Sequence, residues 1–134
     1  MNTKDASPTH QRTAAIVVAA GASRRMNGVD KVFAEVAGRP LLAHGIQVLD
    51  DSPEVNDIVL VLAPGSLDHA RRLVADRGWH KVREICQGGE RRQDSVRNGL
   101  ERVSDAEWVI IHDGARPCLD RDMLLRGLKA ANET

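Results

Sequence analysis

The fold of this chain is decided by AAIVVAAGASRRMNGVDKVF, residues 14–33. The stretch opens on an unbroken apolar run, residues 14–20, and passes into small residues followed by two arginines and a lysine. Small side chains let backbone N–H groups approach phosphate oxygens, while guanidinium and ammonium groups supply positive charge. The stretch therefore predicts a buried strand that ends at a site for a phosphorylated ligand. Its spacing matches neither the GxxxxGK(S/T) phosphate loop nor the GxGxxG motif.

The composition is that of a single soluble globular domain. The chain has 134 residues, of which 42% are apolar and 28% are charged, and this is enough for one workable core. Lys plus Arg equals Asp plus Glu at 19 each, so no overall positive field attracts nucleic acid. One Phe, two Trp and no Tyr argue against a platform that stacks single-stranded bases.

Cysteine usage and hydropathy indicate the compartment. Cys86 and Cys118 lie far apart without a CxxC pair, which argues against a zinc site and favours a reducing cytoplasm. No apolar run approaches the roughly 20 residues needed to span a bilayer, so we expect no membrane association. Residues 1–12 lack the apolar core of a signal peptide and are predicted to form a disordered tail before a domain at residues 13–134.

Segments of strand type alternate with segments of helix type along the domain. Predicted strands lie at residues 14–20, 57–62, 81–86 and 107–112, and predicted helices at residues 41–50, 67–77, 93–103 and 120–131. Ser66 and Asp120 are the predicted N-caps of two helices, and Gly78 is a predicted stop. Such alternation predicts parallel strands, right-handed crossovers and a three-layer α/β/α, Rossmann-like fold. With the common strand order 3-2-1-4, the loops after the first and fourth strands face each other at the ligand-binding edge.

Two later loops are the other candidates for chemistry. Gly88 and Gly89 permit close backbone approach, and Ser95 offers a hydroxyl, so a base held there would be read by backbone groups and hydroxyls instead of by stacking. The alternative is an ordinary strand-to-helix turn. Asp113 follows the last strand and suits a hard cation such as Mg²⁺. The alternatives are a structural ion pair with Arg116 and a turn cap. In the first loop, spacing does not choose between the adjacent arginines at positions 24 and 25.

Three motifs, in this order, resemble the 2-C-methyl-D-erythritol 4-phosphate cytidylyltransferases of the non-mevalonate isoprenoid pathway. They are residues 14–33, GGERRQDSV at residues 88–96 and HDGARP at residues 112–117. The ribitol-5-phosphate cytidylyltransferases share much of the pattern, and sugar nucleotidyltransferases and molybdopterin guanylyltransferases carry loops similar to the first motif. The resemblance implies a glycosyltransferase-A-like nucleotidyltransferase fold and a homodimer. It also implies a magnesium-dependent transfer of CMP from CTP to methylerythritol phosphate with release of pyrophosphate.

Carried over by position, the resemblance implies a role for each motif. Arg25 and Lys31 match the cations that stabilise the transition state, which selects Arg25 over its neighbour. Asp113 matches the magnesium ligand, and Arg116 matches a residue of the phosphate-substrate site. The remaining matches are the CTP-holding backbone at Ala19, Ala20, Gly21 and Ala22, the cytosine-reading loop at Gly89, Glu90 and Ser95, and a nucleotide contact at Gly114.

The resemblance covers nearly all of the chain from Ala14 onward but only about the N-terminal half of such an enzyme. The segment between Arg25 and Lys31 is a compact variant of the family pattern. The family's further strands, dimerisation arm, second magnesium carboxylate and another catalytic lysine would lie after residue 134. We therefore expect part of the CTP site, an uncovered sheet edge, and weak or no turnover. The open alternatives are another nucleotidyltransferase and a catalytically silent nucleotide-binding module.

Overall fold

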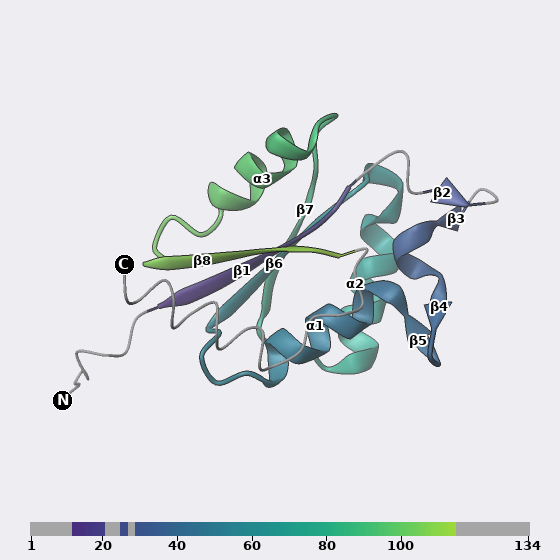
Figure 1. Ribbon diagram of the computed structural model, residues 1–134, viewed down its shortest axis with the longest axis horizontal. Coiled ribbons are helices and arrows are strands. Elements are labelled where there is room, and N and C mark those ends of the chain that lie inside the picture. The colour runs from purple at the N-terminus through teal and green to yellow at the C-terminus, as the bar shows by residue number, and fades with distance from the viewer. Residues whose placement is uncertain (1–11, 21–24, 27–28, 115–134) are drawn as a thin grey trace.

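A four-stranded parallel sheet lies at the centre of the chain (Figure 1). The structure is a computed structural model that describes residues 12–20, 25–26 and 29–114. The strands are β1 (Thr13–Ala19), β6 (Asp57–Leu62), β7 (Val82–Gln87) and β8 (Trp108–Asp113). They lie in the order β7-β6-β1-β8, and every neighbouring pair is parallel. The predicted strand order 3-2-1-4 is confirmed.

Helices cover both faces of this sheet. They are α1 (Leu41–Asp51), α2 (Leu67–Arg77) and α3 (Arg92–Leu100). Figure 1 shows α3 on one face and α1 and α2 on the other. All seven residues of β1 are buried, because this strand is central and both of its faces are covered. The three-layer α/β/α architecture predicted from the sequence is confirmed.

The alternating side chains of β1 enter two separate cores. Ala15 and Val17 belong to the larger core, in which Leu42 and Ile46 of α1 pack against the sheet. Ile16 belongs to the smaller core, which lies under α3. This alternation follows from the two-residue period of a strand, and it means that one apolar run holds both helical layers in place.

Two short hairpins replace what the sequence predicts as loop and turn. The first pairs β2 (Arg25–Met26) with β3 (Val29–Asp30), and the second pairs β4 (Glu35–Val36) with β5 (Arg39–Pro40). Between them lies a 3₁₀ turn, η2 (Lys31–Phe33). Ala37 and Gly38 form the tip of the second hairpin with φ of 53° and 83°. Left-handed φ at both central residues is the conformation that favours a tight two-residue hairpin turn.

Two helix ends differ from the prediction. Helix α3 ends at Leu100 instead of residue 103, because the following N–H groups of Arg102 and Val103 bond three residues back in tighter turns. Ser66 does precede α2, but its side chain makes no capping hydrogen bond. Its ψ of −3° is helical, since it ends the 3₁₀ turn η3 (Pro64–Ser66), whereas a capping serine has an extended backbone.

The stop at Gly78 is confirmed, with a left-handed φ of 67° and N–H bonds to carbonyls of α2. The helix predicted at residues 120–131, with its cap Asp120, lies outside the described residues. Within the part of the chain that is described, no helix is both long and apolar enough to cross a membrane.

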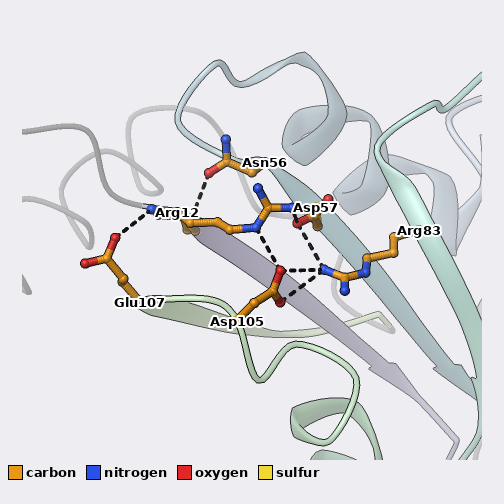
Figure 2. A network of polar contacts seen from close by, with 7 residues as sticks. Arg12, Asn56, Asp57, Arg83, Asp105 and Glu107 are labelled. Carbon is orange, nitrogen blue, oxygen red and sulfur yellow. Dashed lines mark hydrogen bonds and ion pairs between the residues drawn. The ribbon is translucent and has the colours of Figure 1, made fainter. Parts of the chain in front are cut away.

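A network of charged side chains ties the amino-terminal ends of the strands together (Figure 2). Arg12, the last residue of the predicted tail, contacts Asp57 of β6 through Nη2 and Oδ2 at 2.5 Å and Asp105 at 3.2 Å. Arg83 of β7 donates to Asp57 Oδ2 at 3.3 Å and to Asp105 Oδ1 at 3.2 Å. The network therefore joins four segments, which are the residue before β1, β6, β7 and the loop before β8, at the edge of the sheet opposite to the strand ends discussed next.

Candidate functional site

The carboxyl ends of the parallel strands bring the three sequence motifs to one edge of the sheet. The N–H of Gly88, just after β7, bonds to the Leu62 carbonyl at the end of β6 at 2.8 Å. The N–H of Gly114, just after β8, bonds to the Val18 carbonyl of β1 at 2.8 Å. Both bonds extend the sheet by one residue, so the backbone at each motif is held by the sheet itself. This is the edge at which open α/β sheets bind ligands.

The first and second motifs touch through Ala20 and Gly88. A Cβ atom on Gly88 would lie 2.4 Å from the Ala20 Cβ and 2.5 Å from the Ser95 Oγ. Both distances are below any normal contact, so only glycine fits at this position. The structure therefore places the predicted cytosine-reading loop directly against the end of β1, where the CTP-holding backbone is predicted.

The first and third motifs meet in the same way. A Cβ atom on Gly114 would lie 3.0 Å from the Ala19 Cβ and 3.0 Å from Leu42 Cδ1 of α1. Asp113 precedes Gly114, is partly buried, and pairs in register with Val18. The predicted metal ligand therefore lies on the strand next to the predicted phosphate-binding backbone, as the topological argument requires.

Helix α3 orders the loop that precedes it. Ser95, which is 1% exposed, accepts a hydrogen bond through Oγ from the Gly89 N–H at 3.2 Å. Asp94 accepts from the Arg91 N–H at 3.2 Å and from its guanidinium. The hydrogen bonds from Arg91 hold the pKa of the Asp94 carboxyl below its ordinary value. Glu90 is exposed at the tip of this loop.

The two predicted catalytic cations are brought close along the backbone. Arg25 pairs with Asp30 across the β2–β3 hairpin, and Lys31 follows Asp30 directly. The compact segment between the cations is therefore a hairpin that folds their backbones together. Gly21, Ala22 and Arg116 lie outside the described residues.

The turn that begins with Lys31 is anchored in the larger core. Its second residue, Val32, is fully buried, and its third, Phe33, is 8% exposed. The Phe33 ring stacks on the exposed ring of His69 of α2, with centroids 3.9 Å apart and planes inclined by 12°. The sequence assigns no role to His69, and nothing in the helical spacing of α2 indicates this contact.

A metal at this edge would have few protein ligands. Among the described residues, no group of three or more His, Cys, Asp or Glu side chains could hold a metal ion. Mg²⁺ in nucleotide sites is commonly held by one or two carboxylates together with phosphates and waters. A single carboxylate at Asp113, on the strand next to β1, fits that kind of site.

Sequence reasoning missed Asn98, which lies one turn after Ser95 on α3. Its Nδ2 donates to the Gln87 carbonyl at 2.9 Å, immediately before the glycines of the second motif. A spacing of three residues places Asn98 on the same helix face as Ser95, and this spacing is the feature of the sequence that indicates a role for Asn98. The spacing says nothing about the acceptor, because Gln87 is on another element.

The fold and this edge of the sheet define an α/β protein of the nucleotidyltransferase-like class. The sequence model of the IspD family, described as 2-C-methyl-D-erythritol 4-phosphate cytidylyltransferase, matches residues 13–134, and the chain belongs to this family.

Relatives and solved structures agree with the family match. The chain is 50% identical over 122 residues to the 2-C-methyl-D-erythritol 4-phosphate cytidylyltransferase of Dehalococcoides mccartyi, covering 91% of this chain and 54% of that protein. It is 34% identical over 123 residues to the enzyme of that name from Clostridium tetani, covering 91% and 50%. The crystal structure of 4-diphosphocytidyl-2C-methyl-D-erythritol synthase from Anaerococcus prevotii superposes with a TM-score of 0.77 at 25% identity, covering 91% and 51%. The chain thus spans about half the length of the curated relatives it matches.

Proposed function

We propose that this chain forms the CTP-binding part of a magnesium-dependent cytidylyltransferase in isoprenoid precursor synthesis. The reaction transfers CMP from CTP to 2-C-methyl-D-erythritol 4-phosphate and releases pyrophosphate. The observation that supports this most is the pair of small-residue contacts, Ala20 with Gly88 and Ala19 with Gly114, which join all three motifs at one edge of the sheet. Family membership supports the identity of the nucleotide and of the acceptor.

The proposed chemistry needs no general base. A phosphate monoester is largely a dianion near neutral pH, since its second pKa is about 6. One of its oxygens attacks the α-phosphorus of CTP, and the bond from that phosphorus to the bridging oxygen of pyrophosphate breaks. Arg25 and Lys31 stabilise the negative charge that builds on the phosphoryl oxygens and the leaving group. Asp113 is the residue that would hold Mg²⁺, which supplies further positive charge to the phosphates when bound.

The remaining predicted residues position the two substrates. Backbone groups of the segment from Ala19 to Ala22 hold the triphosphate, and Gly114 contacts the nucleotide. The loop with Gly89, Glu90 and Ser95 reads cytosine through backbone groups and a hydroxyl, and Arg116 binds the acceptor phosphate. We further propose that the protein is cytoplasmic and that it forms a homodimer. Analytical ultracentrifugation tests the homodimer.

The direct test is pyrophosphate release from CTP and methylerythritol phosphate in the presence of Mg²⁺. Release with both substrates, and not with GTP, supports the proposal. Release with GTP but not with CTP overturns the cytidylyl assignment. Magnesium-dependent CTP binding without turnover assigns the chain to nucleotide binding alone, an outcome that the half-length match to the relatives makes important to measure.

A further inference from the structure

We propose that Asn98 is a positioning residue that sets the preference of the second-motif loop for cytosine over uracil. The inference rests on the proposed function, in which the loop at Gly88 and Gly89 reads the nucleobase. Asn98 does not touch the nucleotide in this proposal. It acts through the Gln87 carbonyl, to which its Nδ2 donates at 2.9 Å.

The hydrogen bonds around Gly88 hold successive peptide groups from two directions. Asn98 holds the Gln87 carbonyl, and Ser95 holds the Gly89 N–H at 3.2 Å. Between them, the Gly88 N–H bonds to Leu62 of the sheet at 2.8 Å. Helix α3 therefore clamps the loop on both sides of Gly88, with two side chains from one of its faces.

These bonds from α3 matter because the loop distinguishes cytosine from uracil by the direction in which its backbone N–H and C=O groups point. Two successive glycines have more backbone freedom than any other pair of residues, so their peptide groups need external bonds to keep one direction. Cytosine and uracil are similar in size and differ in the donor and acceptor pattern of the base edge, where the amino donor of one replaces a carbonyl acceptor of the other. Backbone groups reject the wrong pattern only if they cannot turn to satisfy it.

The chain offers a control on the same strand, at the turn that follows α3. Arg102, two residues after the end of α3, donates to Glu84 Oε2 of β7 at 2.7 Å, so this pair ties the turn after α3 to β7. Glu84 lies three residues before Gln87 in β7. Glu84→Ala therefore removes a bond between the turn after α3 and β7 without removing either side-chain bond to the loop.

The experiment measures the dissociation constants of CTP and UTP, with Mg²⁺, for the wild type, Asn98→Ala, Asn98→Asp and Glu84→Ala. Asn98→Asp keeps the side-chain shape, but its carboxylate cannot donate to the Gln87 carbonyl. We expect the preference for CTP to fall about 3- to 10-fold in both Asn98 variants, as the loss of one hydrogen bond allows. Glu84→Ala keeps the wild-type preference. In nucleotide-free protein, the Gly88 and Gly89 amides exchange faster with solvent in the Asn98 variants only.

The outcomes separate this inference from the function on which it rests. A wild type that prefers CTP, with Asn98 variants that keep its preference, overturns the positioning role and leaves the proposed function standing. A wild type without preference for CTP overturns both. An equal fall of the preference for CTP in Glu84→Ala also overturns the positioning role, because a general weakening of the packing between the α3 segment and β7 then explains the effect. Thermal unfolding of each variant shows whether it is folded. If Asn98→Ala does not fold, the nucleotide preference of Asn98→Asp provides the test.

Discussion

Gly88 and Ala20 lie so close that a Cβ atom on the glycine would come within 2.4 Å of the alanine Cβ. This contact joins the loop after β7 to the end of β1, although the two residues are far apart in the sequence. Because a Cβ atom is bonded directly to the backbone, neither of these atoms can rotate away. The contact therefore controls how the first two motifs meet.

The first prediction is that Gly88→Ala destabilises the chain by about 1–3 kcal/mol, as overpacking does, and weakens CTP binding. Chemical denaturation and nucleotide titration measure the two effects. Gly38→Ala is the control, because its φ of 83° is unsuited to alanine but nothing lies within 4 Å of the added Cβ. It should lose stability through backbone strain while CTP affinity is kept. Equal loss of affinity in both variants would contradict a local effect at Gly88.

The second prediction concerns Arg25 and Lys31. Replacing either with alanine should lower the rate of pyrophosphate release by about 10²- to 10³-fold, the usual effect of removing one transition-state donor, with a much smaller change in CTP affinity. Arg24→Ala is the matched control and should retain most of the rate. Parallel losses of rate and affinity would argue against transition-state roles, and a larger effect at Arg24 would reverse the choice between the two arginines.

The third prediction concerns the stack of His69 on Phe33. His69→Ala should cost about 0.5–1.5 kcal/mol of stability, the value of an aromatic pair. It should also lower the rate more than the CTP affinity, because Phe33 ends the turn that begins with Lys31. His69→Phe retains a stacked ring and should keep both the stability and the rate near the wild-type values. His80 is an exposed histidine, so His80→Ala should change neither the stability nor the rate. Unfolding curves measure the stability, and pyrophosphate release measures the rate.

The fourth prediction is a pH dependence that arises from Asp105. Burial raises the pKa of this carboxyl, but hydrogen bonds from its own backbone and from Arg83 outweigh burial and leave the pKa below the ordinary 3.8. A carboxyl with a folded pKa below its unfolded pKa contributes stability that is present above 3.8 and is lost as the pH falls through the folded value.

The unfolding midpoint of the wild type should therefore fall more steeply below about pH 4 than that of Asp105→Asn. Asp76→Asn, at an exposed carboxylate of α2, is the control and should keep the wild-type slope. High salt should shrink the difference, because the network is at the surface. Identical slopes in the wild type and Asp105→Asn would show that the network does not link folding to pH.

The fifth prediction is that Ala37→Asn stabilises the chain by about 0.5–1 kcal/mol. Ala37 has a φ of 53°, which is unfavourable for alanine and well tolerated by asparagine at this place in a tight hairpin. Urea unfolding measures the change, and Glu35→Asn in the adjacent strand should not reproduce it. An unchanged midpoint in Ala37→Asn would mean that the turn stores no strain.

Much of the architecture is predictable from the sequence because apolar periodicity is a local property. The run at residues 14–20 predicts the buried central strand, and alternation with helical segments predicts the parallel sheet and its order. The end of α3 is not predictable in this way. Val103 continues the apolar spacing of the helix and is 2% exposed, yet it is reached through tighter turns after Leu100.

The sequence by itself determined the four strands of the parallel sheet, the helices α1, α2 and α3 and the three motifs, because these depend on residues near one another in the chain. Only the tertiary structure decided which atoms meet across elements: Gly88 with Ala20, Gly114 with Ala19, and Asn98 with the Gln87 carbonyl. The physical reason is that such contacts depend on strand order, on register and on how closely α3 packs on the sheet. In the sequence, the glycine at position 88 indicates a flexible turn. In the structure, glycine is the only residue type small enough to fit between Ala20 and Ser95 at this position.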